Sequence, residues 1–253
     1  MKKLIFTISL FMLAFMAKGQ ELNTEVFNVI NLNYEGLSKV KELHAAGKDK
    51  EAATALLDYY RKRQGINHPD VDLSNVKITK EEQKWADDGL KHVFFVHKGY
   101  QPSYHYGDDI NWQYWPVKDN ELRWQLHRTK WWQPMGKAYY ITKDEKYAKE
   151  WVHQYMDWIE KNPLLLKGYN NEDPDANVDL IDNVRFAWRP LEVSHRVQDQ
   201  TIQFLLFLNS PHFTPEFLSQ FLDNYSKHAE HILKIYSKQG NHLLFEAQRE
   251  LYA

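Results

Sequence analysis

The sequence predicts an all-α protein built as an antiparallel array of helical hairpins. Apolar residues recur at spacings of three and four along most of the 253-residue chain, which is typical of amphipathic helices. Nowhere does an apolar–polar alternation of period two extend over the length of a strand. Loops of unequal length join the expected helices, so both an open solenoid and a closed α/α toroid fit the pattern.

About eight helices are expected, and capping or breaking signals bound most of them. Thr79–Glu82 and Thr142–Glu145 have the spacing of a capping box, and Thr214 precedes a proline as an N-cap residue does. Pro134 is expected to kink or break its helix, and Gly240 to end the helix before it. The expected helices cover 34–46, 50–63, 79–92, 121–140, 142–162, 184–208, 214–239 and 243–253.

The longest expected loop covers residues 97–120 and is rich in glycine, proline and aromatic residues. Loops of this length in a compact domain are often functional, and so many aromatic side chains argue against disorder. We therefore expect an ordered segment that either lines a cleft or packs over the helix ends.

The composition narrows the classes of function. With 43% hydrophobic residues, the chain can bury a full core in one or two domains. Its formal net charge of −2 provides no overall basic field, which argues against a nucleic-acid-binding protein. A polyanionic ligand would therefore need basic groups that are gathered locally. The nine tryptophans suit stacking on sugar rings, although most aromatic side chains of a domain lie in its core.

Residues 1–19 have the organisation of a secretory signal peptide. Two lysines precede a largely apolar run over residues 4–16, which is too short to span a membrane. Ala17-Lys18-Gly19 places small residues at the −3 and −1 positions before Gln20. The chain has no cysteine, and therefore neither a lipid-anchoring cysteine nor a disulfide. We expect residues 20–253 to form the mature domain, periplasmic or secreted, with no membrane contact after cleavage.

Few motifs of established chemistry are present. The chain contains no zinc-ligand signature, no glycine-rich phosphate loop and no nucleophile-elbow serine. His228 and His231 are three residues apart on an expected helix, and we interpret them as flanking a solvated face. Asp108, Asp109 and Asp199 could supply a carboxylate pair for glycoside hydrolysis, but loop and surface acids are the simpler interpretation. We expect no cofactor and no metal in this chain.

Several polar and aromatic residues lie at or near expected helix starts, or on loops that lead into them. In an α/α array such ends can gather at one rim. Arginine offers a planar fork for sulfate and carboxylate, and a neighbouring tryptophan adds a stacking surface. For Arg189, an ion pair with an acid such as Glu192 is an equal alternative. The candidate site residues are Asn111, Trp112, Arg123, Trp124, His127, Arg185, Trp188, Arg189, His195, Asn241, His242 and Glu246.

Four motifs resemble those of the heparinase II/III-type polysaccharide lyases, and among these the heparan-sulfate lyases of polysaccharide lyase family 12. The resemblance covers roughly residues 30–253, and the asparagine motif is its most specific part. Asp108–Trp112 and Arg189 favour the heparan-sulfate branch. The similar segments are Ile110-Asn111-Trp112 with Trp115-Pro116, Glu121–Arg128 with Ala138-Tyr139, Val184–Arg189, and Asn241-His242-Leu243-Leu244 with Glu246-Ala247.

The resemblance implies an N-terminal α/α toroid followed by an antiparallel β-sandwich. This chain would then hold a toroid truncated at its C-terminal end, residues 20–253, without the β-sandwich. The implied reaction is β-elimination at a uronic acid, in which the asparagine matched by Asn241 is catalytic and neutralises the substrate carboxylate. The other eleven candidates would bind substrate.

In the family, a tyrosine and a histidine that follow the asparagine motif move the proton, so they would lie outside this chain. We therefore expect a monomer that binds heparan sulfate or a related acidic polysaccharide and does not cleave it alone. A structural divalent cation would belong to the missing part. Two alternatives stay open, a non-catalytic glycan-binding helical scaffold and a toroidal glycoside hydrolase.

Overall fold

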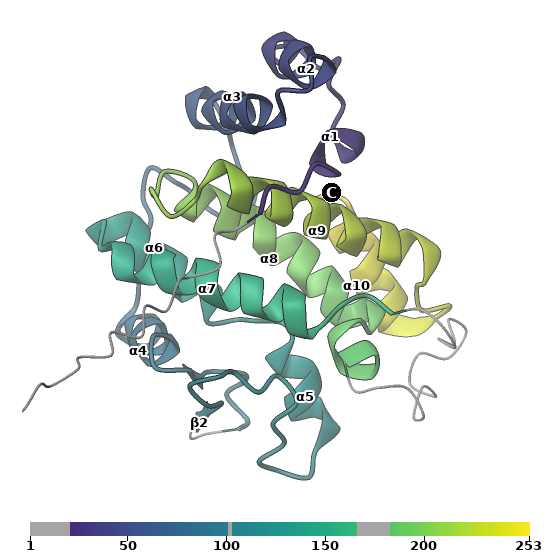
Figure 1. Ribbon diagram of the computed structural model, residues 1–253. Helices are drawn as coiled ribbons and strands as arrows, with labels where there is room; N and C mark the ends of the chain where they lie inside the picture. The colour runs from purple at the N-terminus through teal and green to yellow at the C-terminus, as the bar shows by residue number, and fades with distance from the viewer. Residues whose placement is uncertain (1–20, 101–102, 166–182) are drawn as a thin grey trace, which may run out of the picture.

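The computed structural model describes residues 21–100, 103–165 and 183–253 (Figure 1). This part is mostly helical and contains little strand, so the all-α prediction is confirmed. The expected signal peptide, residues 1–19, lies outside the described residues, and no described helix is long and apolar enough to cross a membrane.

The α-helices are α1 (Val26–Val29), α2 (Ser38–Ala45), α3 (Asp49–Lys62), α4 (Lys80–Gly89), α5 (Asn120–Leu126), α6 (Trp132–Thr142), α7 (Glu145–Lys161), α8 (Pro190–Phe207), α9 (Pro215–Lys234) and α10 (Gly240–Glu250).

One short hairpin interrupts the helices. β1 (Val93–Phe94) pairs antiparallel with β2 (Tyr104–His105), with Val93 opposite His105 and Phe94 opposite Tyr104. Two-residue strands are too short to produce a period-two pattern, which is why the sequence did not predict them. The hairpin follows α4 and leads into the aromatic loop before α5 (Figure 1).

The core lies where α6, α7, α8 and α9 pack side by side (Figure 1). Trp151 of α7 stacks on Phe207 of α8, with ring centroids 4.2 Å apart, and meets Phe217 of α9 edge-on at 5.1 Å. Each fully buried side chain of this size contributes about 1.5–3 kcal/mol to folding. The α2–α3 hairpin packs on this layer through α9, and α10 packs against α8.

Local signals predicted some helix starts correctly. Thr79 and Glu82 form the expected capping box, since each side chain accepts a hydrogen bond from the other residue's backbone N–H. Thr214 accepts from the N–H of Phe217 at 3.1 Å and caps α9. The second expected capping box, at Thr142, was wrong, because Asp144 is the N-cap residue of α7.

Two breaker signals were assigned to the wrong role. The segment 121–140 does contain a break, but Pro134 lies in the first turn of α6, where a missing N–H is tolerated. The chain turns earlier, at Thr129, whose φ is 50°. Gly240 does not end α9, which stops at Lys234; with a φ of 77°, it begins α10. The segment 184–208 is also divided, into a π-helical turn (η2, Asn183–Ala187) and α8.

Candidate functional site

Glu192 lies at the centre of the candidate site. It belongs to the first turn of α8, where the helix dipole favours an acidic side chain, and it is fully buried. Its Oε1 accepts hydrogen bonds from Arg128 Nη2 at 2.8 Å and Nε at 3.2 Å. Its Oε2 lies 3.4 Å from Arg189 Nη1, which confirms the predicted alternative for Arg189. One buried carboxylate thus holds two guanidinium groups side by side.

Aromatic rings lie beside the guanidinium groups of Arg189 and of Arg123, which belongs to α5. The guanidinium of Arg189 lies 4.1 Å from the ring centroid of Trp124, and that of Arg123 lies 3.8 Å from Phe186. Arg123 also lies 5.3 Å from the ring of Trp115, which is 43% exposed. Each such cation–π contact stabilises the charge by about 0.5–2 kcal/mol. The structure therefore brings together three predicted residues, Arg123, Trp124 and Arg189.

His195 lies one turn further along α8, among more positive charges. Burial, and then the charges of Arg128, Arg249 and Lys130, lower the pKa of His195 to about 2. The imidazole is therefore neutral at neutral pH. Lys130 Nζ donates to the amide of Gln125 at 2.8 Å, so its contact does not neutralise its charge.

We call the group Arg123, Arg128, Lys130, Arg189, His195 and Arg249 the basic face. Among the described residues, four carboxyl groups accompany its five permanent cations, and one of them is Glu246, which faces Arg249. Glu192 is central, Glu121 lies 4.0 Å from Arg128, and Asp199 faces Arg249 and Lys130. Burial raises the pKa of Asp199 to about 7, against the opposing pull of those two cations, so its negative charge is partial at neutral pH. The basic face therefore carries net positive charge in a chain whose net charge is negative.

Asn241 lies in the first turn of α10 and its side chain is exposed. α9 is antiparallel to α8, because His231 near its end donates to the carbonyl of Trp188 just before α8 begins. α9 is also antiparallel to α10, since Tyr225 donates to the carbonyl of Tyr252 beyond the far end of α10. α8 and α10 thus run in the same direction. Asn241 lies at the end of the layer where α8 begins, which is also the end that carries the paired arginines.

Three predicted site residues face the interior. The indole of Trp112 donates to Asp157 Oδ2 at 2.7 Å, and that of Trp188 donates to the carbonyl of Asn162 at 2.8 Å. Glu246 is buried and accepts hydrogen bonds from the N–H and the hydroxyl of Ser237, at 2.7 and 2.8 Å. The structure gives these side chains packing partners instead of a surface that a ligand could reach.

The other four predicted residues are spread out. Asn111 is exposed, and its side chain accepts from the N–H of Gln113 within the aromatic loop. His127 is fully buried, and burial together with Arg196 and Arg123 lowers its pKa well below the usual range. Two half-buried residues lie nearer to the candidate site. Arg185 lies 5.0 Å from the ring of Phe186, on which Arg123 also stacks, and His242 follows Asn241 on α10.

The interpretation of His228 and His231 as flanking a solvated face was wrong. Both histidines are buried. His228 Nε2 accepts from Arg196 Nε at 2.7 Å, and His231 Nε2 donates to the carbonyl of Trp188 at 2.7 Å. The face of α9 that carries them turns inward because α8 places a buried arginine opposite it. The acids Asp108 and Asp109, by contrast, are exposed on the loop, as expected.

Sequence reasoning did not single out Arg128, Lys130 or Arg249. Arg128 is the last residue of Glu121–Arg128, one of the motifs that resemble the family, and this position was the one signal in the sequence that could have identified it. Lys130 lies in the turn between α5 and α6, where no periodicity applies. Arg249 joins the basic face only because α10 packs on α8, where its Nε donates to Gln198 at 3.1 Å.

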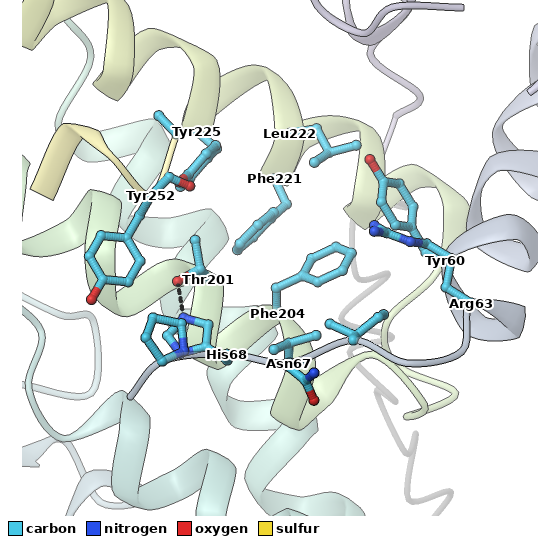
Figure 2. A pocket seen from close by; sticks show the side chains of 14 residues that line it. Tyr60, Arg63, Asn67, His68, Thr201, Phe204, Phe221, Leu222, Tyr225 and Tyr252 are labelled. Atoms are coloured by element: carbon cyan, nitrogen blue, oxygen red, sulfur yellow. Dashed lines mark hydrogen bonds between the residues drawn. The ribbon is translucent and has the colours of Figure 1, made fainter. Parts of the chain in front are cut away.

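A cavity of about 460 Å³ lies on a different part of the molecule, between α3, α8 and α9 (Figure 2). Figure 2 shows Phe204, Phe221 and Tyr225 converging on it, with His68 donating to Thr201 Oγ1 at 2.8 Å. Its lining combines aromatic and aliphatic side chains and includes one arginine, Arg63. An acidic polysaccharide is therefore matched better by the basic face than by this cavity.

Comparison with known proteins agrees with the resemblance seen in the motifs. Two curated proteins named heparin-sulfate lyase are 64% identical over 240 residues (Bacteroides stercoris) and 49% identical over 246 residues (Pedobacter heparinus). Each alignment covers 94% of this chain, and 36% and 35% of the respective relative. The chain thus spans about a third of the length of these relatives.

Solved structures give the same result. A heparinase III structure superposes with a TM-score of 0.83 at 63% identity, covering 93% of this chain and 36% of that one. A crystal structure of a heparan sulfate lyase from Pedobacter heparinus superposes with a TM-score of 0.80 at 49% identity, covering 91% and 35%. Residues 26–253 match the family model described as the heparinase II/III N-terminus. The chain therefore belongs to the heparinase II/III family, in the region that its N-terminal model describes.

Proposed function

We propose that this chain supplies the substrate-binding part of a heparan-sulfate lyase. The observation that carries the proposal is the basic face, which contains five permanent cations, two of them at Glu192, in a chain of negative net charge. Such a local field attracts a polyanion. The names of the similar proteins support heparan sulfate as the polyanion.

The proposed chemistry is β-elimination at a uronic acid. A base removes the proton at C5, the bond from C4 to the 4-oxygen breaks, the leaving oxygen takes up a proton, and a C4–C5 double bond forms. The neighbouring carboxylate makes the C5 proton weakly acidic, because a second negative charge develops beside the first. A hydrogen-bond donor at the carboxylate therefore lowers the barrier. We assign this role to the amide of Asn241, whose exposed side chain lies at the same end of the helical layer as Arg189.

We assign the proton transfers to a tyrosine and a histidine that follow the asparagine motif in the longer family members. On this basis the present chain binds heparan sulfate weakly and does not turn it over. The test is to incubate the purified chain with heparan sulfate and follow the ultraviolet absorbance of the unsaturated uronate. We expect a flat trace together with salt-sensitive binding. A steady rise in absorbance from this chain alone would refute the assignment.

The remaining expectations about architecture and location are part of the same proposal. We propose that the antiparallel hairpins belong to an α/α toroid, which a β-sandwich follows in the full-length protein. Residues 1–19 act as a cleaved signal peptide, and residues 20–253 act as a monomeric part of a periplasmic or secreted protein. The packing of α6 against α7 and of α8 against α9 supports the hairpin arrangement.

Asn241→Ala in a full-length form tests the catalytic assignment. We expect most of the turnover to be lost while heparan sulfate binding is retained, because the amide acts mainly on charge that develops in the transition state. His212→Ala is a matched control, since this half-buried side chain lies on the loop between α8 and α9. If Asn241→Ala keeps turnover within a few-fold of the parent, Asn241 has no catalytic role and serves only at the start of α10.

A non-catalytic glycan-binding module is the second candidate function. The exposed indole of Trp115 beside Arg123 favours it, because a stacking ring next to a cation binds a sulfated sugar without any chemistry. Retained affinity with no unsaturated product, even in a full-length form, would identify this module. A glycoside hydrolase is less well supported, since Asp109 pairs with Lys161 and Asp108 projects from the loop.

A further inference from the structure

A second cluster of titratable side chains lies away from the basic face, between α7 and the chain that enters β1. It consists of His92, which follows α4, and of Glu150 and His153 on α7. One ligand atom from each of the three residues lies within 4.8 Å of the others. Glu150 and His153 are three residues apart and therefore share one face of the helix.

His92 is oriented by an unusual backbone conformation and by a hydrogen bond. Its φ is 53°, in the left-handed region that costs a residue with a side chain about 1 kcal/mol. Its Nδ1–H donates to the carbonyl of Gly107 at 2.7 Å. Nε2 faces Glu150 Oε1, 3.0 Å away, and donates to it when it carries a proton; without that proton the same nitrogen offers its lone pair to a cation beside the carboxylate. Metal-binding histidines have this arrangement, in which the second ring nitrogen donates to a backbone carbonyl and orients the ring.

Glu150 is held in place from the core. Its Oε1 accepts a hydrogen bond from Gln154 Nε2 at 2.9 Å. Gln154 is itself fully buried, and its oxygen accepts from the indoles of Trp131 and Trp132, each at 2.8 Å. Two of the three side chains are therefore positioned by second partners, while His153 is exposed and able to adjust.

We propose that His92, Glu150 and His153 bind one divalent cation of the zinc class, with a fourth position open to solvent. Ligands of a tetrahedral zinc ion at 2.0–2.1 Å lie roughly 3.3 Å from one another. The distance between His92 Nε2 and Glu150 Oε1 is close to that value. A rotation of the exposed His153 side chain would bring its ring nitrogen to a similar distance from both. Two imidazoles and one carboxylate suit zinc, whereas calcium and magnesium prefer sites made entirely of oxygen ligands.

The bound cation would tie α7 to the hairpin that leads into the aromatic loop. The residues of the basic face take no part in it, so the proposal stands independently of the proposed function. The sequence could not reveal the site, because His92 and Glu150 are 58 residues apart and carry no ligand spacing.

Calorimetric titration of the chelator-treated chain with Zn²⁺ tests the proposal, alongside the visible absorption of bound Co²⁺. We expect one saturable site, the absorption of a four-coordinate cobalt ion, and a melting temperature that rises with Zn²⁺. His153→Ala should weaken binding at least tenfold, while His212→Ala, which removes a histidine outside the cluster, should bind like the parent. Because His153 is exposed, its removal should leave the fold intact, which circular dichroism checks.

His92→Asn is the second variant, because asparagine tolerates the left-handed backbone conformation. It should keep the helical spectrum and lose the cobalt absorption. A protein that shows no saturable Zn²⁺ binding would overturn the proposal and leave His92 and Glu150 as an ordinary ion pair. Unchanged affinity in His153→Ala would overturn it as well, since the metal would then bind elsewhere.

Discussion

Two clusters of arginine, histidine and tryptophan lie within the same helical layer, and they differ in what occupies the arginine donors. In the first cluster, Arg196 is fully buried and donates to His228 Nε2 at 2.7 Å. It also donates to the carbonyls of His127 at 2.8 Å and Ala187 at 2.6 Å, and its guanidinium lies 4.5 Å from the ring of Trp158. Each of these partners is an internal acceptor or ring, so the role of Arg196 is structural.

The second cluster is the basic face. There, Arg128 and Arg189 both contact the carboxylate of Glu192, Arg128 also lies 4.0 Å from Glu121, and Lys130 and Arg249 donate to neutral amides. Positive charge therefore remains around Lys130 and Arg249, which are half-buried, whereas Arg128 and Arg189 are buried. Residue type therefore does not by itself separate a structural arginine from one proposed to bind a ligand. Arg196 is structural because its Nε, Nη1 and Nη2 all donate to internal acceptors.

The largest expected effect is on stability, and it comes from Arg196→Met. The substitution leaves His228 Nε2 and two carbonyl oxygens buried without their donor. We expect the free energy of unfolding to fall by about 3–5 kcal/mol, which urea titration measures. Arg63→Met, at an exposed position, is the control and should change stability by less than about 1 kcal/mol. Equal losses in both variants would remove the distinction between the clusters.

His195 belongs to the basic face, and the pH dependence of stability tests how strongly this histidine is buried among its positive charges. Its pKa is about 2 in the folded protein, against roughly 6.5 in the unfolded chain. Between these values the unfolded chain binds one proton more, so stability rises with pH up to about 6.5 and is lost as the pH falls below it. His195→Asn should reduce the slope of unfolding free energy between pH 4 and 6 by about 1.4 kcal/mol per pH unit.

Burial also lowers the pKa values of His127 and His228. The His195 variant keeps both histidines, so its free energy of unfolding should still fall as the pH is lowered, but less steeply than that of the parent. Urea titrations at several pH values measure both slopes. Parallel stability curves for parent and variant would show that His195 ionises normally and that the basic face is more open to water than its geometry indicates.

The smallest expected effect is on affinity and comes from Lys130→Gln. We expect the affinity for a heparan sulfate oligosaccharide to fall about 3–10-fold, with a weaker dependence on salt, because one charge that attracts the polyanion is removed. Lys149→Gln, at an exposed position on α7, is the matched control and should leave the affinity unchanged. If the two variants bind equally, the polyanion does not use the basic face. Stability should change by less than about 0.5 kcal/mol in both.

The candidate site was predictable in part. Arg123, Trp124 and Arg189 were all candidates from the sequence, and the structure places them close together. Trp112 and Trp188 were expected beside them but are buried, because an amphipathic pattern cannot tell an aromatic residue of the core from one that lines a cleft. Arg128 and Arg249 were not singled out, since their importance arises from contacts between α5, α8 and α10.

By itself, the sequence determined the helices and their best caps, such as Thr79 and Thr214, because these depend on residues within a few positions of one another. It also determined the family, through motifs that are continuous in the chain. Only the tertiary structure decided that Arg196 is enclosed, that Glu192 joins two arginines, and that His92 meets α7. Those outcomes depend on which element packs opposite each side chain, and separations of 58 or 64 residues leave no local pattern from which that packing could be derived.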